Sequence, residues 1–527
     1  MAKARRAQRE SEGVVLPMMG VQQNAPGGKG PHFGHARAKG TGAGMIRSTG
    51  PNHPAGREPI DNVRRLQRKL FVAAKRHRGR RFHALFAHIC RADLLQEAWK
   101  RVRRNGGAAG VDGETLAVAE EYGIARLLAE LADDLRSGRY RPSPVLRRHI
   151  PKAAGGTRPL GIPTVKDRVA QMAAKLVLEP IFEADFRSSS YGYRPRRSAL
   201  QALETIRERA NGGAEYVLDA DIADFFGSLD HGVLMALMAK RISDRRVLRL
   251  IRRWLGAGVM EDGHFRENVA GVPQGGVISP LLANIYLHVL DRVWEQRCAH
   301  LGTLVRYADD LVVLARSPEA LVESERRVAI VLTHLKLMLH PDKTRKLILT
   351  EGRGGFEFLG HYLRKRVSGK LLERGIRRHY LQRWPSPRSM RRVRQRVHEL
   401  TDRRWNGAKD VRVLIGNLNP VLRGWGEYFR TGNAARKFLS IDRYVTGRLR
   451  RFLVRRAGRN LRAGRAAQWT REWFWGQGLH RLRGTVRYPK LCVLHEKAIV
   501  KPDAGKPHVR FERGSVVPGA LRIAPGH

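Results

Sequence analysis

Adjacent aspartates carry the first chemical signal in this chain. Asp309 and Asp310 lie within residues 304–314, Leu-Val-Arg-Tyr-Ala-Asp-Asp-Leu-Val-Val-Leu, between two runs of β-forming residues. This pattern predicts a hairpin with an acidic tip. A plain turn is the ordinary explanation of an Asp-Asp tip. A second acidic strand earlier in the chain argues against that explanation.

The second strand is predicted over residues 216–226, Tyr-Val-Leu-Asp-Ala-Asp-Ile-Ala-Asp-Phe-Phe. Asp219 and Asp221 share one face of it, because side chains alternate along a strand. Mg²⁺ prefers hard oxygen ligands and is held by one or two carboxylates plus substrate phosphates. Carboxylates from separate strands can hold two ions roughly 3.5–4 Å apart, the arrangement that stabilises in-line displacement at phosphorus.

We therefore predict nucleotidyl transfer. The predicted catalytic residues and ligands of two Mg²⁺ ions are Asp221, Asp309 and Asp310, and the backbone carbonyl of Ile222 is expected to add a further oxygen.

Composition points to a polyanionic partner. The 527 residues include 100 Lys and Arg against 48 Asp and Glu, a formal charge of +52, and nucleic acid is the expected partner. A general preference for arginine codons explains Arg over Lys but not the scarcity of acids. No apolar run of about 18 residues is present, so no membrane role is expected. Three separated cysteines oppose a disulfide framework and a zinc finger and favour a reducing cytosol.

Two motifs carry a family resemblance. Tyr307-Ala308-Asp309-Asp310 follows Gly-Val-Pro-Gln-Gly-Gly-Val-Ile-Ser-Pro-Leu-Leu-Ala-Asn-Ile-Tyr-Leu at residues 271–287. The first resembles the palm of a reverse transcriptase, and the second is similar to group II intron reverse transcriptase/maturases. Residues 418–432, Leu-Asn-Pro-Val-Leu-Arg-Gly-Trp-Gly-Glu-Tyr-Phe-Arg-Thr-Gly, look like the signature of the maturase domain, also called the thumb or X domain.

Lys152 and Arg158 flank a predicted hairpin turn, and two cations at this separation can clamp a triphosphate. By resemblance they contact the incoming nucleotide, although solvated strand charges remain the alternative. In the family pattern Phe226 lies beneath the sugar and would clash with a 2′-hydroxyl, which implies a DNA product. The family often has Asp at position 227, where this chain has Gly227. The predicted nucleotide-binding residues are Lys152, Arg158, Phe226, Gln274, Asp224 and Ala223.

Further candidates rest on the same resemblance. Arg194, Lys343 and Tyr307 are secondary candidates, with Arg194 either a template contact or a structural residue. The predicted RNA-binding residues of the thumb are Arg423, Trp425 and Arg430. Residues 386–490 hold 27 Lys and Arg against 6 Asp and Glu, which favours RNA binding along amphipathic helices. The aromatic residues of 469–475 can either stack on bases or form a small core.

The resemblance implies an α+β right-hand polymerase: fingers and palm with an antiparallel palm sheet, followed by an α-helical thumb. The predicted organisation is a disordered basic N-terminal arm (1–60), fingers (61–215), palm (216–365), thumb/maturase domain (366–460), and a basic DNA-binding-like segment with a tail (461–527).

The expected function is RNA-directed DNA polymerisation for a mobile group II intron, with RNA binding that assists splicing and retrohoming. The alternatives are a non-polymerising maturase and a reverse transcriptase of a retron, diversity-generating or defence lineage. The expected partners are group II intron RNA, target or primer DNA and deoxynucleoside triphosphates, and a homodimer is left open. The paired cysteines of a C-terminal HNH endonuclease are absent, so the primer is expected from another source. The bacterial cytosol or nucleoid is the expected location, with an organelle as the alternative.

Overall fold

A computed structural model gives the fold. It describes residues 62–487 apart from 152–155, 269, 353, 368–371, 374, 376, 378, 403–409 and 459–463. The predicted basic arm, the tail beyond residue 487 and Lys152 therefore lie outside the described residues. No helix in the described part is long and apolar enough to cross a membrane.

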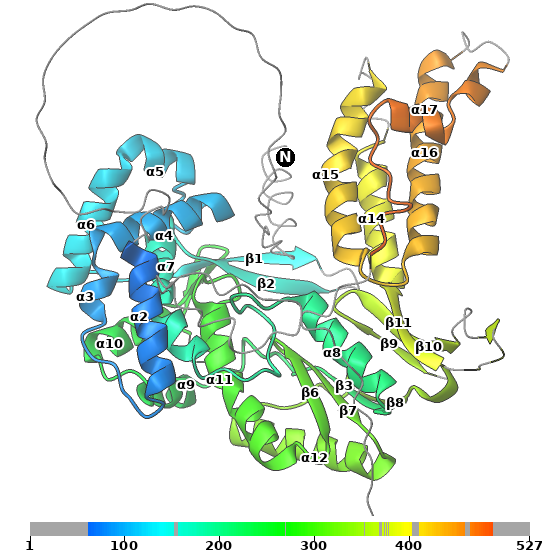
Figure 1. The fold of residues 1–527 in the computed structure, drawn as a ribbon. Helices are drawn as coiled ribbons and strands as arrows, with labels where there is room; N and C mark the ends of the chain where they lie inside the picture. Colours follow the sequence, from blue (N-terminus) through cyan, green and yellow to red (C-terminus); the bar gives the residue numbers. More distant parts are fainter. Residues whose placement is uncertain are drawn as a thin grey trace, which may run out of the picture.

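The first helices pack around one central helix (Figure 1). α7 (Val165–Glu183) is buried at almost every position, because its apolar residues surround the helix instead of forming one stripe. α2 (Asn62–Arg76) and α4 (Ala92–Asn105) contact α7 through buried leucines, and their charged faces point outward. The shorter members of this group are α3 (Phe86–Ile89), α5 (Leu116–Tyr122) and α6 (Ile124–Ser137).

A four-stranded sheet with the order β2-β1-β4-β5 lies beside these helices. β1 (Val145–Pro151) and β2 (Thr157–Ile162) form an antiparallel hairpin. β4 (Val259–Glu261) joins β1 in parallel, and β5 (His264–Arg266) completes the edge. Residues 259–266 thus belong to the same sheet as β1 and β2, although they lie within the range predicted for the palm.

The palm sheet has the order β6-β7-β3-β8, and every neighbouring pair is antiparallel. Its strands are β3 (Tyr216–Ala220), β6 (Gly302–Tyr307), β7 (Asp310–Ala315) and β8 (Arg345–Ile348). One face of the sheet packs against α12 (Pro318–His334), and α8 (Ala199–Asn211) contacts β6 and β7. The remaining helices of this region are α9 (His231–Ala239), α10 (Arg245–Leu255) and α11 (Ser279–Val293), which continues into a short π-helix (Trp294–Cys298).

The strand predicted over residues 216–226 is shorter than expected. β3 ends at Ala220, and Asp221 follows it directly. Residues 223–227 form a turn in which Asp224 has φ 35°, a positive value that Asp tolerates better than most residues. Phe225 and Phe226 are therefore held by this turn and not by the sheet.

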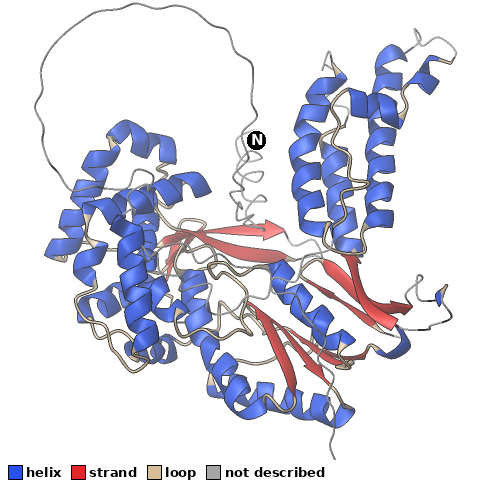
Figure 2. Ribbon diagram, in the orientation of Figure 1, coloured by secondary structure: helices blue, strands red, loops and turns tan. Residues whose placement is uncertain are grey.

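A three-stranded sheet and a helical bundle complete the chain. β9 (Gly355–Phe358), β10 (His361–Val367) and β11 (His379–Pro385) form an antiparallel sheet. The helices α14 (Pro387–Glu399), α15 (Val411–Phe429) and α16 (Ala435–Ala457) stand side by side above it, with the short α17 (Arg471–Gly476) against them (Figure 2). This bundle has a hydrophobic core separate from that of the fingers and palm. The predicted α+β fold with an antiparallel palm sheet and a helical thumb is confirmed.

Candidate active site

Strand register brings the three aspartates to one end of the palm sheet. The last pair between β3 and β7 is Ala220 with Leu311. Asp221 and Asp310 are the next residues of the two strands, so they continue that register at the strand ends. Tyr307 pairs with Asp310 across β6 and β7, which leaves Ala308 and Asp309 as the hairpin turn.

The charges of the acidic cluster act on one another. Burial, followed by the charges of Asp309 and Asp221, raises the pKa of Asp310 to about 7. The Asp310 residue as a whole is exposed to solvent, but protein atoms crowd its carboxyl group. Burial also raises the pKa of Asp309, with Asp221 adding to the effect. The opposing charges of Arg158 and Lys343 reach Asp309 from the fingers and from the loop before β8.

The carboxylate oxygens of the cluster are of the type that binds Mg²⁺, but the described residues do not form a complete coordination site. Among them, no three carboxylate, histidine or cysteine side chains are close enough together to hold a metal ion. The carboxylate of Asp221 instead pairs with Lys343, with 2.5 Å between Oδ2 and Nζ. Clustered carboxylates that raise one another's pKa suit an ion that keeps waters and binds substrate phosphates as additional ligands.

The backbone carbonyl of Ile222, next to Asp221, is not used in the local hydrogen bonds. Ile222 forms an isolated bridge with Leu339. The two hydrogen bonds of this bridge run from the N–H of His340 to the carbonyl of Asp221 (2.8 Å) and from the N–H of Ala223 to the carbonyl of Met338 (3.0 Å). The carbonyl of Ile222 takes no part in them, as a metal-binding oxygen requires.

A buried ion pair supports the hairpin turn. Arg306 and Asp291 are both 0 % exposed, and the guanidinium of Arg306 donates to both carboxylate oxygens at 2.8 and 2.5 Å. Arg306 also donates to the amide oxygen of Asn284 (3.1 Å), the hydroxyl of Ser190 (2.8 Å) and the carbonyl of Ala308 (3.0 Å). This network was not predicted from the sequence, although an arginine inside an apolar strand is a signal of a buried partner.

The turn itself is held in a strained conformation. Ala308 has φ 58°, which is unfavourable for a residue with a Cβ, and surrounding contacts must maintain it. Gly192 packs against it so closely that an added Cβ would lie 2.5 Å from the amide nitrogen of Ala308. The backbone of Tyr191 donates to the carbonyl of Arg306 (2.9 Å), so the segment before α8 is tied to the hairpin.

Tyr193 is a further site residue that the sequence analysis did not select. It is 40 % exposed, and its ring centroid lies 6.3 Å from that of Tyr307. Burial of its hydroxyl and the charge of Asp309 raise the pKa of Tyr193. An aromatic ring therefore lies open to solvent beside the acidic turn.

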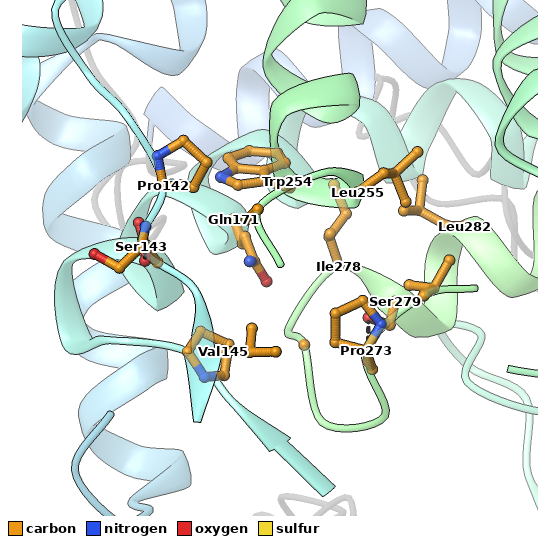
Figure 3. A pocket seen from close by; sticks show the side chains of 15 residues that line it. Pro142, Ser143, Val145, Gln171, Trp254, Leu255, Pro273, Ile278, Ser279 and Leu282 are labelled. Atoms are coloured by element: carbon orange, nitrogen blue, oxygen red, sulfur yellow. Dashed lines mark hydrogen bonds between the residues drawn. The ribbon is translucent and has the colours of Figure 1, made fainter. Parts of the chain in front are cut away.

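The Pro-Gln-Gly-Gly loop joins the fingers to the palm. The N–H of Gly161 on β2 donates to the carbonyl of Gln274 (2.6 Å), and Gly275 has no room for a Cβ against Gly161. From α7, Gln171 accepts a hydrogen bond from the N–H of Val277 (3.0 Å). Figure 3 shows the small cavity behind this loop, which includes Gln171 and Trp254 in its lining. Its volume of about 20 Å³ corresponds to one water, so it is not a nucleotide site.

The described nucleotide-binding candidates differ in their exposure to solvent. Arg158 is exposed on β2. Phe225 is buried, whereas Phe226 is half-buried and meets it edge to face at 5.2 Å. Asp224 is exposed and its carboxylate occupies the space above Gly227, so a larger side chain at position 227 would collide with it. Ala223 and Gln274 are half-buried.

Arg194 has a structural role. It is 3 % exposed and donates to both carboxylate oxygens of Glu183 (3.0 and 2.8 Å) and to the carbonyls of Arg187 and Ser190. Because these contacts occupy its guanidinium inside the protein, the structural alternative holds and the template contact does not.

The RNA-binding candidates of α15 differ from one another. Trp425 is half-buried and packs on Phe429 and Phe438, with ring centroids 4.9 and 5.4 Å apart, at the margin of the thumb core. Arg430 pairs with Glu427 at 2.7 Å, and Arg423 is exposed. The three tryptophans of residues 469–475 are partly buried against the same core, as the core alternative expected.

Comparisons with known proteins agree with this geometry. The family model described as reverse transcriptase (RNA-dependent DNA polymerase) matches residues 150–363, and the model of the group II intron maturase-specific domain matches residues 390–473. "Protein YkfC" of Escherichia coli (strain K12) is 36 % identical over 346 residues, which cover 58 % of this chain and 89 % of that protein. The chain belongs to the group II intron reverse transcriptase/maturase family.

The "Group II intron-encoded protein LtrA" of Lactococcus lactis subsp. cremoris is another relative. It is 39 % identical over 214 residues, which cover 40 % of this chain but only 35 % of LtrA. Among solved structures, a chain of the "Partial Cas6-RT-Cas1--Cas2 complex" is 25 % identical, covers 47 % of this chain and 42 % of that chain, and has a TM-score of 0.31.

The family assignment decides between the lineages considered above. A reverse transcriptase region followed by a maturase-specific domain characterises the group II intron proteins, so the other reverse transcriptase lineages are not favoured. The enzyme class of this reverse transcriptase/maturase is RNA-directed DNA polymerase.

Proposed function

We propose that this reverse transcriptase/maturase copies RNA into DNA at the Asp221–Asp309–Asp310 cluster and binds group II intron RNA to assist splicing and intron mobility. The observation that carries the proposal is the register of β3 and β7, which sets Asp221 against Asp310 beside the turn at Asp309. Its substrates are deoxynucleoside triphosphates and a DNA primer on an RNA template, and its location is the bacterial cytosol.

Asp221, Asp309, Asp310 and the carbonyl of Ile222 would hold two Mg²⁺ ions. When bound, the ions stabilise charge on the attacking 3′-oxygen and on the leaving oxygen. The chain positions the other reactants. Arg158, together with Lys152, binds the triphosphate, because an arginine fork and a lysine point charge suit phosphate oxygens.

Three further side chains shape the site. The half-buried ring of Phe226 lies under the sugar and excludes a 2′-hydroxyl. Lys343 neutralises Asp221 through their ion pair. The backbone of Gln274, bonded to Gly161, keeps the loop against the fingers hairpin and so closes one side of the nucleotide site.

The thumb supplies the RNA-binding surface in this proposal. Its helices α14, α15 and α16 bury an apolar core and carry arginines outward, Arg423 among them. Such a face binds a nucleic acid backbone with a strength that falls as salt rises.

Substitution of one aspartate tests the polymerase proposal. Asp309→Ala is expected to abolish extension of a DNA primer on an RNA template, because one carboxylate of the ion-binding set is lost. RNA binding by the same variant should change less than about twofold, since the phosphate contacts made by the thumb remain.

Asp133→Ala is the matched control, because it removes an exposed carboxylate from α6, away from the palm. It should extend primers at the rate of the unmodified protein. Continued extension by Asp309→Ala at that rate would refute the assignment.

A further inference from the structure

Helix α10 has an unusually basic outer face. Its sequence is Arg-Arg-Val-Leu-Arg-Leu-Ile-Arg-Arg-Trp-Leu, and its apolar residues, Val247, Leu250, Ile251, Trp254 and Leu255, are buried. The arginines at positions 245, 249, 252 and 253 recur at the spacing that places them along the opposite side of the helix. With Arg141, which lies just before β1, they form what we call the α10 arginine face.

Most cations of this face have no acidic partner among the residues that the structure describes. Within the described part of the chain, Arg245, Arg249 and Arg252 make no ion pair and no side-chain hydrogen bond. The nearest acid along the chain, Asp244, is buried and accepts hydrogen bonds from the N–H groups of Arg246 and Phe86.

Paired arginines elsewhere show the contrast. On α12, Arg326 and Arg327 both bind Glu323, at 2.7 and 2.5 Å. On the α10 arginine face, burial and then the neighbouring charges of Arg141 and Arg249 lower the pKa of Arg253. Like charges therefore face one another without compensation, and an anionic partner would relieve their repulsion.

A groove runs along this face between α9 and α10. Met235 and Ala239 of α9 and Leu248 of α10 line it, and Arg252 stands at its edge. An apolar floor beside an arginine suits the sugar and phosphate of a nucleic acid strand, because the guanidinium forms bidentate contacts with phosphate.

The face lies away from the polymerase cleft. Figure 1 shows α10 on the side of the fingers that is remote from the thumb helices α14–α16, with α7 and the β1–β2 hairpin between them. A primer–template duplex held between fingers and thumb therefore does not cover it. Any nucleic acid on α10 is a different segment from the one being copied.

We propose that the α10 arginine face binds the phosphate backbone of folded RNA outside the polymerase cleft. The proposal rests on the proposed function in one respect, which is that the RNA is the intron that this protein accompanies. RNA is chosen over DNA because the proposed function gives this protein a folded RNA that is larger than the segment being copied, and a DNA duplex is an outcome that the test distinguishes.

The test uses the full chain loaded with an RNA template and a DNA primer that fill the cleft. A fluorescent RNA hairpin is then added, and its anisotropy is measured over a range of KCl concentrations. Arg245→Gln/Arg249→Gln/Arg252→Gln is expected to weaken hairpin binding by about tenfold or more and to reduce the salt slope by about 3, one per lost phosphate contact. Primer extension on the short template should stay unchanged.

Arg126→Gln/Arg326→Gln/Arg327→Gln is the matched control, because it removes the same charge from arginines that are already paired with acids. Equal hairpin binding by the two triple variants would overturn the proposal. Displacement of the primer–template by the hairpin would also overturn it, because both would then share the cleft. Equal binding of a DNA duplex of the same length would overturn the choice of RNA.

The two proposals fail in different ways. If the unmodified protein never extends a primer, the polymerase proposal fails. Loss of hairpin binding in the α10 variant would still support RNA binding by the α10 arginine face.

Discussion

At the scale of single residues, the acidic cluster depends on buried polar groups beneath it. Arg306 holds the carbonyl of Ala308 and both carboxylate oxygens of Asp291 in a site closed to water. A buried charge that loses its partner is strongly destabilising, whereas removal of both charges is far less so. The turn that carries Asp309 should therefore be sensitive to Arg306 in stability and in activity.

We predict that Arg306→Met destabilises the protein by about 3–5 kcal/mol, because Asp291 is left as an unpaired buried carboxylate. Adding Asp291→Leu should restore part of this loss. Urea unfolding of both variants measures the effect. A double variant less stable than Arg306→Met would contradict the explanation.

Primer extension should stay low in the double variant even where stability returns. The reason is that Ala308, at φ 58°, has lost the hydrogen bond that holds its carbonyl. Full activity of a stable double variant would show that the network supports folding alone.

Phe226 belongs to the same scale. Phe226→Val should raise incorporation of ribonucleotides relative to deoxyribonucleotides by roughly tenfold or more, because a smaller side chain leaves room for the 2′-hydroxyl. The ratio of kcat/KM for the two nucleotides measures this selectivity. Phe182→Leu is the control, since Phe182 is buried on α7, and an unchanged ratio in Phe226→Val would remove the proposed role.

At the scale of elements, the junction of β10 and α15 attaches the thumb to the palm. His361 on β10 is fully buried, and its ring lies 4.6 Å from that of Phe429 on α15. The carbonyl of Leu359 accepts hydrogen bonds from Nδ1 of His361 (3.2 Å) and from the hydroxyl of Tyr428 (2.8 Å). Since the other ring nitrogen of His361 has no hydrogen-bond partner among the described residues, the neutral imidazole is the form that fits.

This junction predicts a pH dependence of stability. Burial lowers the pKa of His361 to about 3, from 6.5 in the unfolded chain. The unfolded state therefore binds the proton more readily than the folded state. The contribution of neutral His361 to stability is complete above pH 6.5 and falls as the pH drops toward 3. Between about pH 8 and pH 5 the loss should be about 2 kcal/mol, measured by urea unfolding.

His361→Leu removes the titrating group. Over the same pH interval, the free energy of unfolding of this variant should fall by about 2 kcal/mol less than that of the unmodified protein. If the stability of the unmodified protein and of the variant changed equally with pH, other titratable groups would be responsible for the effect.

At the scale of the whole molecule, charge dominates association with nucleic acid. The chain carries +52, and much of the excess lies in the region of the thumb helices. Cations of this number release condensed counterions when they bind a phosphate backbone. Association with RNA should therefore be governed by salt more than by sequence.

We predict that RNA affinity falls by about 10³–10⁵ between about 50 and 200 mM KCl, as expected for roughly six to ten phosphate contacts. Titrations of one labelled RNA at several salt concentrations give the slope, and Asp309→Ala should have the same slope as the unmodified protein. A nearly salt-independent affinity would exclude a backbone-dominated interface.

Local pattern determined a defined part of this protein. Two β-forming runs around Asp309 and Asp310 were sufficient to predict the hairpin, because strand alternation and turns depend on neighbouring residues. The motifs at residues 271–287 and 418–432 were sufficient for the family, and charge was sufficient for the class of partner. These properties can be predicted without knowing which elements pack against one another.

Tertiary structure decided which residues come together. Only strand pairing set Asp221 against Asp310, joined β4 to β1, and brought Arg306 to Asp291. Only packing separated buried Arg194 and half-buried Trp425 from exposed Arg423. Periodicity shows that an element has a face to bury, but the element that covers that face is distant in the chain. The energy of that contact depends on both elements together, so neither segment predicts it alone.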